Sequence, residues 1–175
     1  MDVKYLDDCK NWFDETLEVF PKLKSKKVEV QYKAMTARRL GYVSAKIPQE
    51  LDFDPEALLL GESNSVKKRR RKPKEFKIFI NAKMQKIKNI ALRKQIVQHI
   101  LLHELLHIEN EDLITISKQY NRRKKKKIHV NDFDNEVFQR FNQLRELKGI
   151  MQIQKREHLD IAISRILESI NWFKK

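Results

Sequence analysis

Glycine and proline are scarce in this chain, and their scarcity is the strongest constraint on its fold. Only three glycines and four prolines occur in 175 residues, whereas all-β sandwiches and barrels need many short turns built from these residues. A mostly helical protein is therefore expected. Hydrophobic residues make up 41% of the chain, which is too many for a wholly disordered protein and enough for one buried core.

Apolar residues recur at helical spacing in four long segments. They are Val3–Phe20, which Pro21 ends; Ile87–Glu109; a segment from Asn131 or Asp132 to Lys148, which Gly149 ends; and Ile150–Phe173. Alternating apolar residues predict three strands, at Val28–Tyr32, Leu40–Ile47 and Phe76–Ile80. Between the second and third strands, the sequence predicts a short helix at Leu51–Leu60 and a loop at Glu62–Glu75, whereas Asp112–Lys127 has no clear pattern. The fold class expected is α+β, a helix-rich domain with a small three-stranded sheet.

The chain is short enough for one domain with an appended helix. We expect residues 1–148 to form that domain and residues 149–175 to form a C-terminal amphipathic helix. This helix either packs on the domain or acts as a lid over a cleft or as an oligomer contact.

The sequence lacks a second cysteine, a signal peptide and a long apolar stretch, and these features bear on the cellular compartment. Cys9 is the only cysteine, so no disulfide can form within the chain. Met1–Cys9 contains three aspartates rather than the basic start of a signal peptide, and no window approaches 18 uncharged apolar residues. The sequence predicts an intracellular protein without a membrane span, cytoplasmic or, in a eukaryote, nuclear.

The chemistry-bearing motif is His103-Glu104-Leu105-Leu106-His107, an H-E-x-x-H pattern in the longest predicted helix. Residues four apart lie on one helical face, so both imidazoles can reach one Zn²⁺, which binds imidazole nitrogen at about 2.0–2.1 Å. Glu104 points about a quarter turn away, from where its carboxylate can act as the general base on a metal-activated water. A chance match would occur in about 1% of chains with this composition. The alternative is two partly buried histidines in an ordinary helix.

A catalytic zinc site needs a third protein ligand, and the sequence offers two candidates downstream. The extended motif with a glycine and a third histidine fails, because Asn110 and Leu113 occupy those positions. His129 precedes the predicted helix from Asn131, and Glu136 lies one turn into it. Glu136 could instead form an i,i+4 ion pair with Arg140, and His129 could be a loop histidine; we favour His129. His99 is interpreted as a structural or exposed residue rather than a ligand, and His158 belongs to the predicted C-terminal helix and is given little weight.

This pattern resembles the small zincin metallopeptidases. SprT-like proteases combine an N-terminal helix, a short sheet, a His-Glu-x-x-His helix and a later His-x-x-x-Phe, here His129 with Phe133. Archaeal minigluzincins are similar in size and order, but their third ligand is a glutamate, here Glu136. The resemblance covers about Val28 to Leu147, although Val130 replaces the glycine usual in SprT-like proteins. It implies zinc-dependent hydrolysis of peptide bonds, with the Phe76–Ile80 strand as the rim of the cleft and its edge pairing with the substrate.

Positive charge is concentrated in two runs. The net charge is +14, and the two runs with Lys74 hold 13 cations, so the rest of the chain is close to neutral. Such charges suit sequence-independent phosphate contacts, and SprT-like proteases act on proteins attached to DNA. The alternatives are solvated loops or an anionic lipid. The residues are Lys67, Lys68, Arg69, Arg70, Arg71 and Lys72 in the first run, and Arg122, Arg123, Lys124, Lys125, Lys126 and Lys127 in the second.

Two functions remain open at this point. The first is a zinc metallopeptidase acting on a protein or peptide substrate, with His103, His107 and His129 as ligands, Glu104 as general base and nucleic acid as a partner. The group that stabilises the oxyanion is not identified, and Tyr120 and Arg140 are candidates. The second is a non-enzymatic, basic nucleic-acid-binding protein with a structural zinc, which would need four protein ligands and no Glu104.

Overall fold

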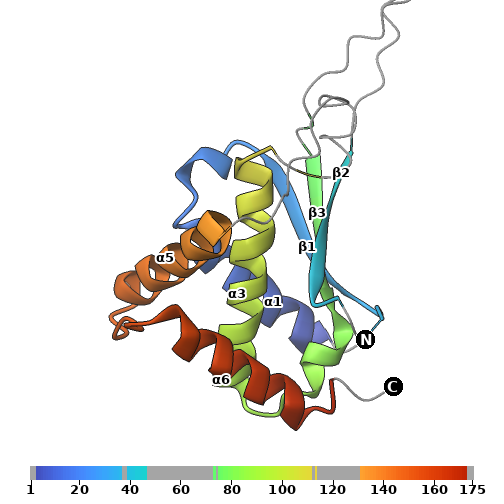
Figure 1. The fold of residues 1–175 in the computed structure, drawn as a ribbon. Helices are drawn as coiled ribbons and strands as arrows, with labels where there is room; N and C mark the ends of the chain where they lie inside the picture. The colour runs from blue at the N-terminus through green and yellow to red at the C-terminus, as the bar shows by residue number, and fades with distance from the viewer. Residues whose placement is uncertain are drawn as a thin grey trace, which may run out of the picture.

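The computed structural model describes residues 3–36, 39–46, 73, 75–111, 113 and 131–172. Within them, four α-helices lie on one side of a three-stranded mixed sheet, which confirms the predicted α+β class (Figure 1). The elements in chain order are α1 (Val3–Leu17), the 3₁₀ helix η1 (Pro21–Leu23), β1 (Lys27–Lys33), β2 (Gly41–Lys46), β3 (Glu75–Asn81), the 3₁₀ helix η2 (Ala82–Lys86), α3 (Ile90–Glu109), α5 (Asn131–Leu147) and α6 (Arg156–Ser169).

The three predicted strands all form, and the last of them is the central one. The strand order is β1-β3-β2, with β3 parallel to β1 and antiparallel to β2. Ile78 and Ile80 in β3 are fully buried, whereas in β1 exposed residues alternate with partly buried ones and only Tyr32 is buried. Two neighbours and one buried face therefore make β3 the strand around which the sheet is organised.

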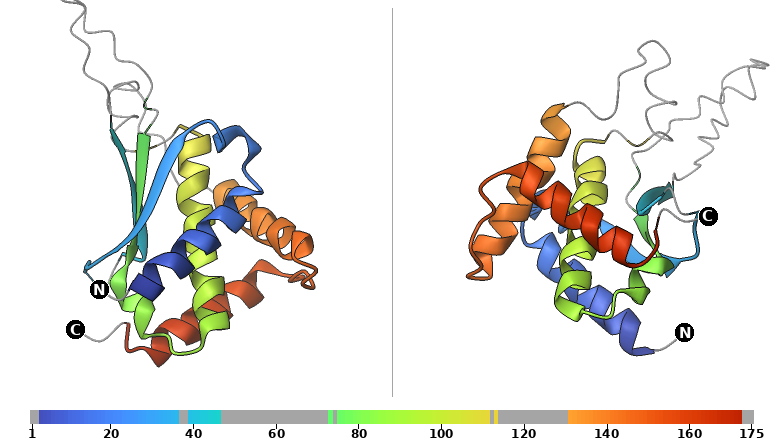
Figure 2. Two further views of the ribbon diagram at one scale, coloured as in Figure 1. Left: turned by 180° about the vertical axis from the view of Figure 1, so that it is seen from behind. Right: turned by 60° about the horizontal axis from the view of Figure 1, so that its bottom comes forward.

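Helix α3 is the central helix of the molecule. It lies against the sheet, with α1 beside it and α5 and α6 on its far side (Figures 1 and 2). Its buried residues cover nearly every side, including Ile96, Leu101 and Leu105, as expected for a helix surrounded by protein. It begins at Ile90 rather than at the predicted Ile87, because the Asn89 side chain accepts a hydrogen bond from the backbone N–H of Leu92 at 3.1 Å.

The prediction that the first helix runs to Phe20 is wrong by one turn. Helix α1 ends at Leu17, and a turn carries the chain into η1, which begins at Pro21. The N–H of Phe20 bonds to the Leu17 carbonyl at 3.0 Å, and the Phe20 side chain is fully buried. Burying this ring in the core favours the turn over another helical turn.

The prediction that the C-terminal helix begins at Ile150 is also wrong. Gly149 has φ +67°, and the N–H of Ile150 bonds to the Arg145 carbonyl at 2.8 Å, the hydrogen-bond pattern that ends a helix at a glycine. The Asn142 side chain then holds the backbone of Ile153 through two hydrogen bonds of 2.9 Å. Helix α6 therefore begins only at Arg156.

Helix α6 contributes to the same core as the rest of the fold. Leu159, Leu167 and the following Trp172 are buried in the cluster that also contains α3 and α5 side chains. Among the described residues, no helix combines the length and the apolar character needed to cross a membrane. The predicted Leu51–Leu60 helix, and almost all of the Glu62–Glu75 loop and the Asp112–Lys127 segment, lie outside the described residues.

Candidate metal centre

The two histidines of the motif converge at their ring nitrogens. Nε2 of His103 and Nε2 of His107 are 3.2 Å apart on successive turns of α3. Two nitrogens bound to one tetrahedral Zn²⁺ at 2.0–2.1 Å would be about 3.4 Å apart. The two imidazoles therefore already lie at the separation that a shared zinc ion requires.

Phe133 holds both imidazoles from the facing helix. Its ring stacks on His107 with centroids 4.5 Å apart and meets His103 edge-on at 5.0 Å. Phe133 and His107 are buried, so the orientation of these rings is fixed by packing. This contact brings the first turn of α5 to the histidine pair, and Phe133 belongs to the predicted His-x-x-x-Phe segment.

Glu104 lies beside the histidine pair and faces the sheet. Its side chain is buried, and together with His103 it lines a cavity of about 240 Å³ between α3 and the start of β2. Gly41 lines the same cavity, and a Cβ added there would lie 2.6 Å from Cγ2 of Ile100 and 3.6 Å from Oε1 of Glu104. The absence of a side chain at Gly41 therefore lets β2 approach the motif helix closely.

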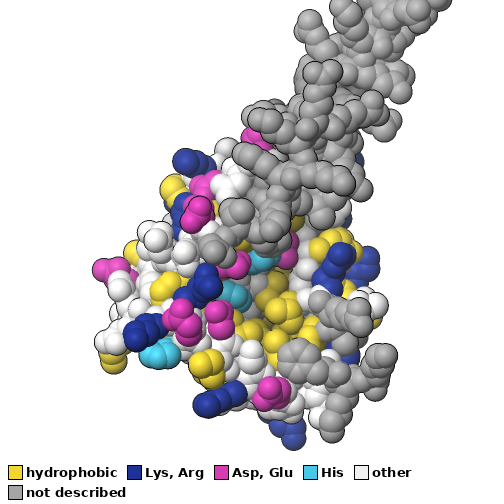
Figure 3. All heavy atoms as spheres, in the orientation of Figure 1, with side chains coloured by type: hydrophobic (Ala, Val, Ile, Leu, Met, Phe, Trp, Pro, Cys, Tyr) yellow, Lys and Arg dark blue, Asp and Glu magenta, His cyan; other side chains and the backbone are white. Residues whose placement is uncertain are grey.

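A second cavity, of about 170 Å³, lies on the other side of α3, where α5 and α6 meet it. His99 and His103 line both cavities, so the two adjoin along α3. The space-filling view shows histidine surface at the centre of this face, between acidic and hydrophobic side chains (Figure 3). His103 of the histidine pair thus borders both cavities, whereas His107 is buried and lines neither of them.

His99, interpreted from the sequence as structural or exposed, is half-buried as a residue. Its Nδ1 is inaccessible and has no hydrogen-bond partner among the residues that the structure describes, and its ring meets Phe141 edge-on at 6.1 Å. Burial lowers the pKa of His99 to about 4, although the charge of Asp134 opposes this shift. The ring is consequently neutral at pH 7.

Glu136, the alternative third ligand, does not join the histidine pair. Its carboxylate lies 3.8 Å from the Arg140 guanidinium, as the i,i+4 interpretation expected. Within the described residues, no three histidine, cysteine or acidic side chains are grouped as a metal site. The Arg140 side chain also bonds to the buried carboxylate of Glu109 at 2.9 Å and to the Val19 carbonyl. Arg140 therefore connects three segments of the fold, which disfavours its predicted role in stabilising an oxyanion.

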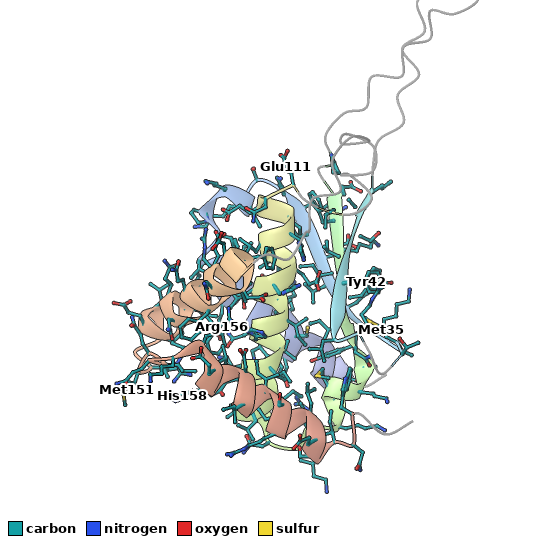
Figure 4. The ribbon with its side chains drawn as sticks, viewed as in Figure 1. Met35, Tyr42, Glu111, Met151, Arg156 and His158 are labelled. Atoms are coloured by element: carbon teal, nitrogen blue, oxygen red, sulfur yellow. The ribbon has the colours of Figure 1, made fainter. Side chains whose placement is uncertain are left out.

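Several predicted residues lie outside the described part of the chain. They are His129, Tyr120 and both basic runs, Lys67–Lys72 and Arg122–Lys127. His158 is described and lies exposed on α6 (Figure 4).

The prediction that Phe76–Ile80 offers an edge to substrate is wrong. This strand, β3, is central and pairs with β1 and β2 on its two sides. The edge strand next to the motif helix is β2, whose first residue, Gly41, packs against Ile100. Strand alternation alone cannot distinguish a central from an edge strand, because it reports which face is buried and not which strands are neighbours.

Sequence reasoning missed the walls of the two cavities. Gly41 carries no motif, and Asp134, Arg156 and Asp160 around the second cavity read as ordinary helix-surface residues. Only the packing of α5 and α6 on α3 brings these three charged residues to the site.

No family model, curated protein or solved structure matches this chain.

Proposed function

We propose that this protein is a zinc-dependent metallopeptidase that hydrolyses peptide bonds in protein or peptide substrates inside the cell. The observation that carries the proposal is the 3.2 Å separation of Nε2 of His103 and Nε2 of His107, beside a buried Glu104 and an open cavity. The resemblance of the motif to small zincins, SprT-like or minigluzincin-like, supports the same activity.

Each residue of the candidate site has its own proposed role in the reaction. His103 and His107 would hold zinc with His129, which precedes the first residue of α5 by two positions in the sequence and is our choice for the third ligand. Bound zinc would supply a Lewis acid that activates a water near neutral pH and polarises the scissile carbonyl. The Glu104 carboxylate would serve as the general base that takes a proton from the attacking water and would pass it to the nitrogen of the leaving amine. Its burial next to His103 favours this role, because a shielded carboxylate interacts strongly with nearby charge.

The substrate would lie along β2. An extended peptide can add its backbone to an exposed sheet edge, and β2 is the edge strand that borders the cavity lined by Glu104. We propose further that Lys67–Lys72 and Arg122–Lys127 bind the phosphates of nucleic acid, so that the enzyme acts on proteins associated with DNA.

Metal content and one substitution test the enzymatic proposal. Purified protein should contain about one zinc per chain, and Glu104→Gln should keep the zinc but lose proteolysis by at least about a hundredfold. His103→Ala and His107→Ala should lose both. Glu157→Gln, on the exposed surface of α6, is the matched control and should keep both.

The alternative is a non-enzymatic nucleic-acid-binding protein with a structural zinc. Such a site is closed by four protein ligands and leaves no position for water. Zinc binding without proteolysis in the native protein, together with nucleic-acid binding that Glu104→Gln leaves unchanged, would favour this alternative. Absence of zinc would contradict both proposals.

A further inference from the structure

One face of the three-stranded sheet is not covered by the helices that the structure describes, all of which lie against the other face (Figures 1 and 2). Side chains alternate between the two faces along each strand. We call the uncovered surface, together with Arg39 just before β2, the open face. Most of its residues are exposed, whereas Tyr42 is half-buried and Phe79 keeps 9% of its surface exposed. Its strand residues are Lys27, Glu29, Gln31 and Lys33 in β1, Tyr42, Ser44 and Lys46 in β2, and Glu75, Lys77 and Phe79 in β3.

The open face carries more positive than negative charge. Two carboxylates stand among five cations, which are Lys27, Lys33, Arg39, Lys46 and Lys77. Glu29 and Glu75 are each already paired with two lysine ammonium groups, at 3.0–3.8 Å. Within the described part of the chain, Lys33 and Arg39 have no carboxylate partner and contact aromatic rings instead. A surface with such an excess of cations attracts a polyanion.

An aromatic pair lies where these two unneutralised cations are. The rings of Tyr42 and Phe79 stack with centroids 4.7 Å apart. Nζ of Lys33 donates to the Tyr42 hydroxyl at 2.9 Å and lies 4.9 Å from the Phe79 centroid, and the Arg39 guanidinium lies 5.3 Å from the Tyr42 centroid. Tyr42 lies on the side of the sheet away from the helices (Figure 4). Surfaces that bind single-stranded nucleic acid combine these two elements, with bases on the rings and phosphates on the cations.

Tyr42 is the ring of this pair that can take a base. Phe79 is nearly covered, whereas Tyr42 is half-buried on the edge strand. The contact of Arg39 with Tyr42 is an exposed cation–π contact, which is weaker than the stacking of a base on an aromatic ring. A base can therefore take the place of the guanidinium, which then reaches a phosphate. Only an unpaired strand offers the faces of its bases, and an anionic lipid surface has no flat ring to stack on Tyr42.

We propose that the open face binds a single strand of nucleic acid, with a base stacked on Tyr42 and phosphates held by Lys33 and Arg39. This binding depends neither on zinc nor on the two basic runs. Arg39 also lines the cavity that Glu104 lines, so the bound strand would lie beside the proposed cleft and bring an attached protein to it. That consequence alone rests on the proposed peptidase function.

Oligomers that differ only in their bases test the stacking. By fluorescence anisotropy, the native protein should bind a labelled oligothymidylate at least about fivefold more tightly than an abasic oligomer with the same number of phosphates. Tyr42→Leu should remove this preference, whereas Tyr42→Phe, which keeps the ring and loses the hydroxyl, should retain it. The basic runs contact phosphates alone and would bind the two oligomers equally. Equal affinity for both oligomers in the native protein would therefore overturn the inference even where the runs bind nucleic acid.

Substitution of the two cations tests the phosphate contacts. Lys33→Gln combined with Arg39→Gln should reduce the slope of log K against log salt for oligothymidylate by about 0.7 for each cation. Lys22→Gln combined with Lys88→Gln, at exposed positions elsewhere, is the matched control and should leave the slope smaller by less. Equal slopes in the two double variants would contradict the assigned contacts. Binding to phosphatidylserine vesicles that requires Lys33 and Arg39, without any preference for bases, would assign the open face to lipid and overturn the inference.

A measurement on the native chain does not depend on any variant folding. The NMR signals of the Tyr42 ring should shift when oligothymidylate is added and stay in place with the abasic oligomer, both with zinc and with a chelator. Such a shift in protein that cleaves no peptide would support the open face and contradict only the proposed enzyme. Ring signals that respond equally to both oligomers, or to neither, would overturn the inference.

Discussion

Gly41 is the residue at which the sheet and the motif helix come closest. A Cβ there would lie 2.6 Å from Cγ2 of Ile100 and 3.0 Å from the Phe79 carbonyl oxygen. We expect Gly41→Ala to lower the free energy of unfolding by about 1–3 kcal/mol, because β2 or the Ile100 side chain must move. Urea denaturation measures the change, with Ser44→Ala on the exposed part of β2 as the control. Equal stability of Gly41→Ala and Ser44→Ala would show that the approach is looser than described.

His99 makes the stability of the metal-free protein depend on pH. Its pKa is lowered from 6.5 to about 4 by burial, so the unfolded chain binds the proton first as the pH falls. The contribution is fully present above about pH 6.5, is lost between about pH 6.5 and 4, and amounts to about 3 kcal/mol. We expect chemical denaturation with a chelator present to show this loss in the native protein. In His99→Leu that part of the slope should be absent; an unchanged slope would assign it to other groups.

At the scale of elements, Asn142 connects α5 to the segment that leads into α6. Its side chain donates to the Ile153 carbonyl and accepts from the Ile153 N–H, both at 2.9 Å. Asn142→Ala leaves two backbone groups without these partners and should cost about 1–3 kcal/mol. Hydrogen exchange should become faster in α6 than in α3, whereas Gln143→Ala, on the exposed side of α5, should change neither. Uniform acceleration throughout the chain would contradict a local role.

The elements themselves were largely predictable, because each depends on a local pattern. Alternation placed all three strands, and the Gly149 stop placed the end of α5 within one residue of the observed Leu147. The order of the strands was not predictable, since pairing joins residues far apart in sequence, such as Lys27 and Glu75. The true start of α6 depends on Asn142 reaching Ile153, which is likewise a tertiary contact.

At the scale of the whole molecule, one part of the candidate site could be predicted from the sequence and another part could not. The spacing of His103, Glu104 and His107 is a property of one helix, so the sequence alone could propose a metal pair. The contact of Phe133 with both imidazoles, and the cavity walls from β2, α5 and α6, arise only when these elements pack together. Phe133, for example, contacts the histidine pair because α5 packs against α3.

The net charge of +14 is likewise a property of particular segments rather than of the fold as a whole. If the two basic runs hold DNA, changing Lys67–Lys72 and Arg122–Lys127 to glutamine should flatten the dependence of log K on log salt. Removing one phosphate-binding cation should reduce the slope by about 0.9. Fluorescence anisotropy with a labelled duplex measures the slope. Glutamine at Lys22, Lys24 and Lys88, which are exposed elsewhere, is the control, and equal slopes for both variants would contradict a specific role of the runs.

The 3.2 Å contact between the two imidazoles also has a consequence for where their protons reside. A hydrogen bond between the two Nε2 atoms requires one neutral ring to carry its proton on Nε2 and the other to carry it on Nδ1. Both rings can serve as metal ligands through Nε2 only as the Nδ1–H tautomer. His103 and His107 should therefore give unequal ring ¹⁵N signals in the metal-free protein, and zinc should convert them to a single tautomeric form.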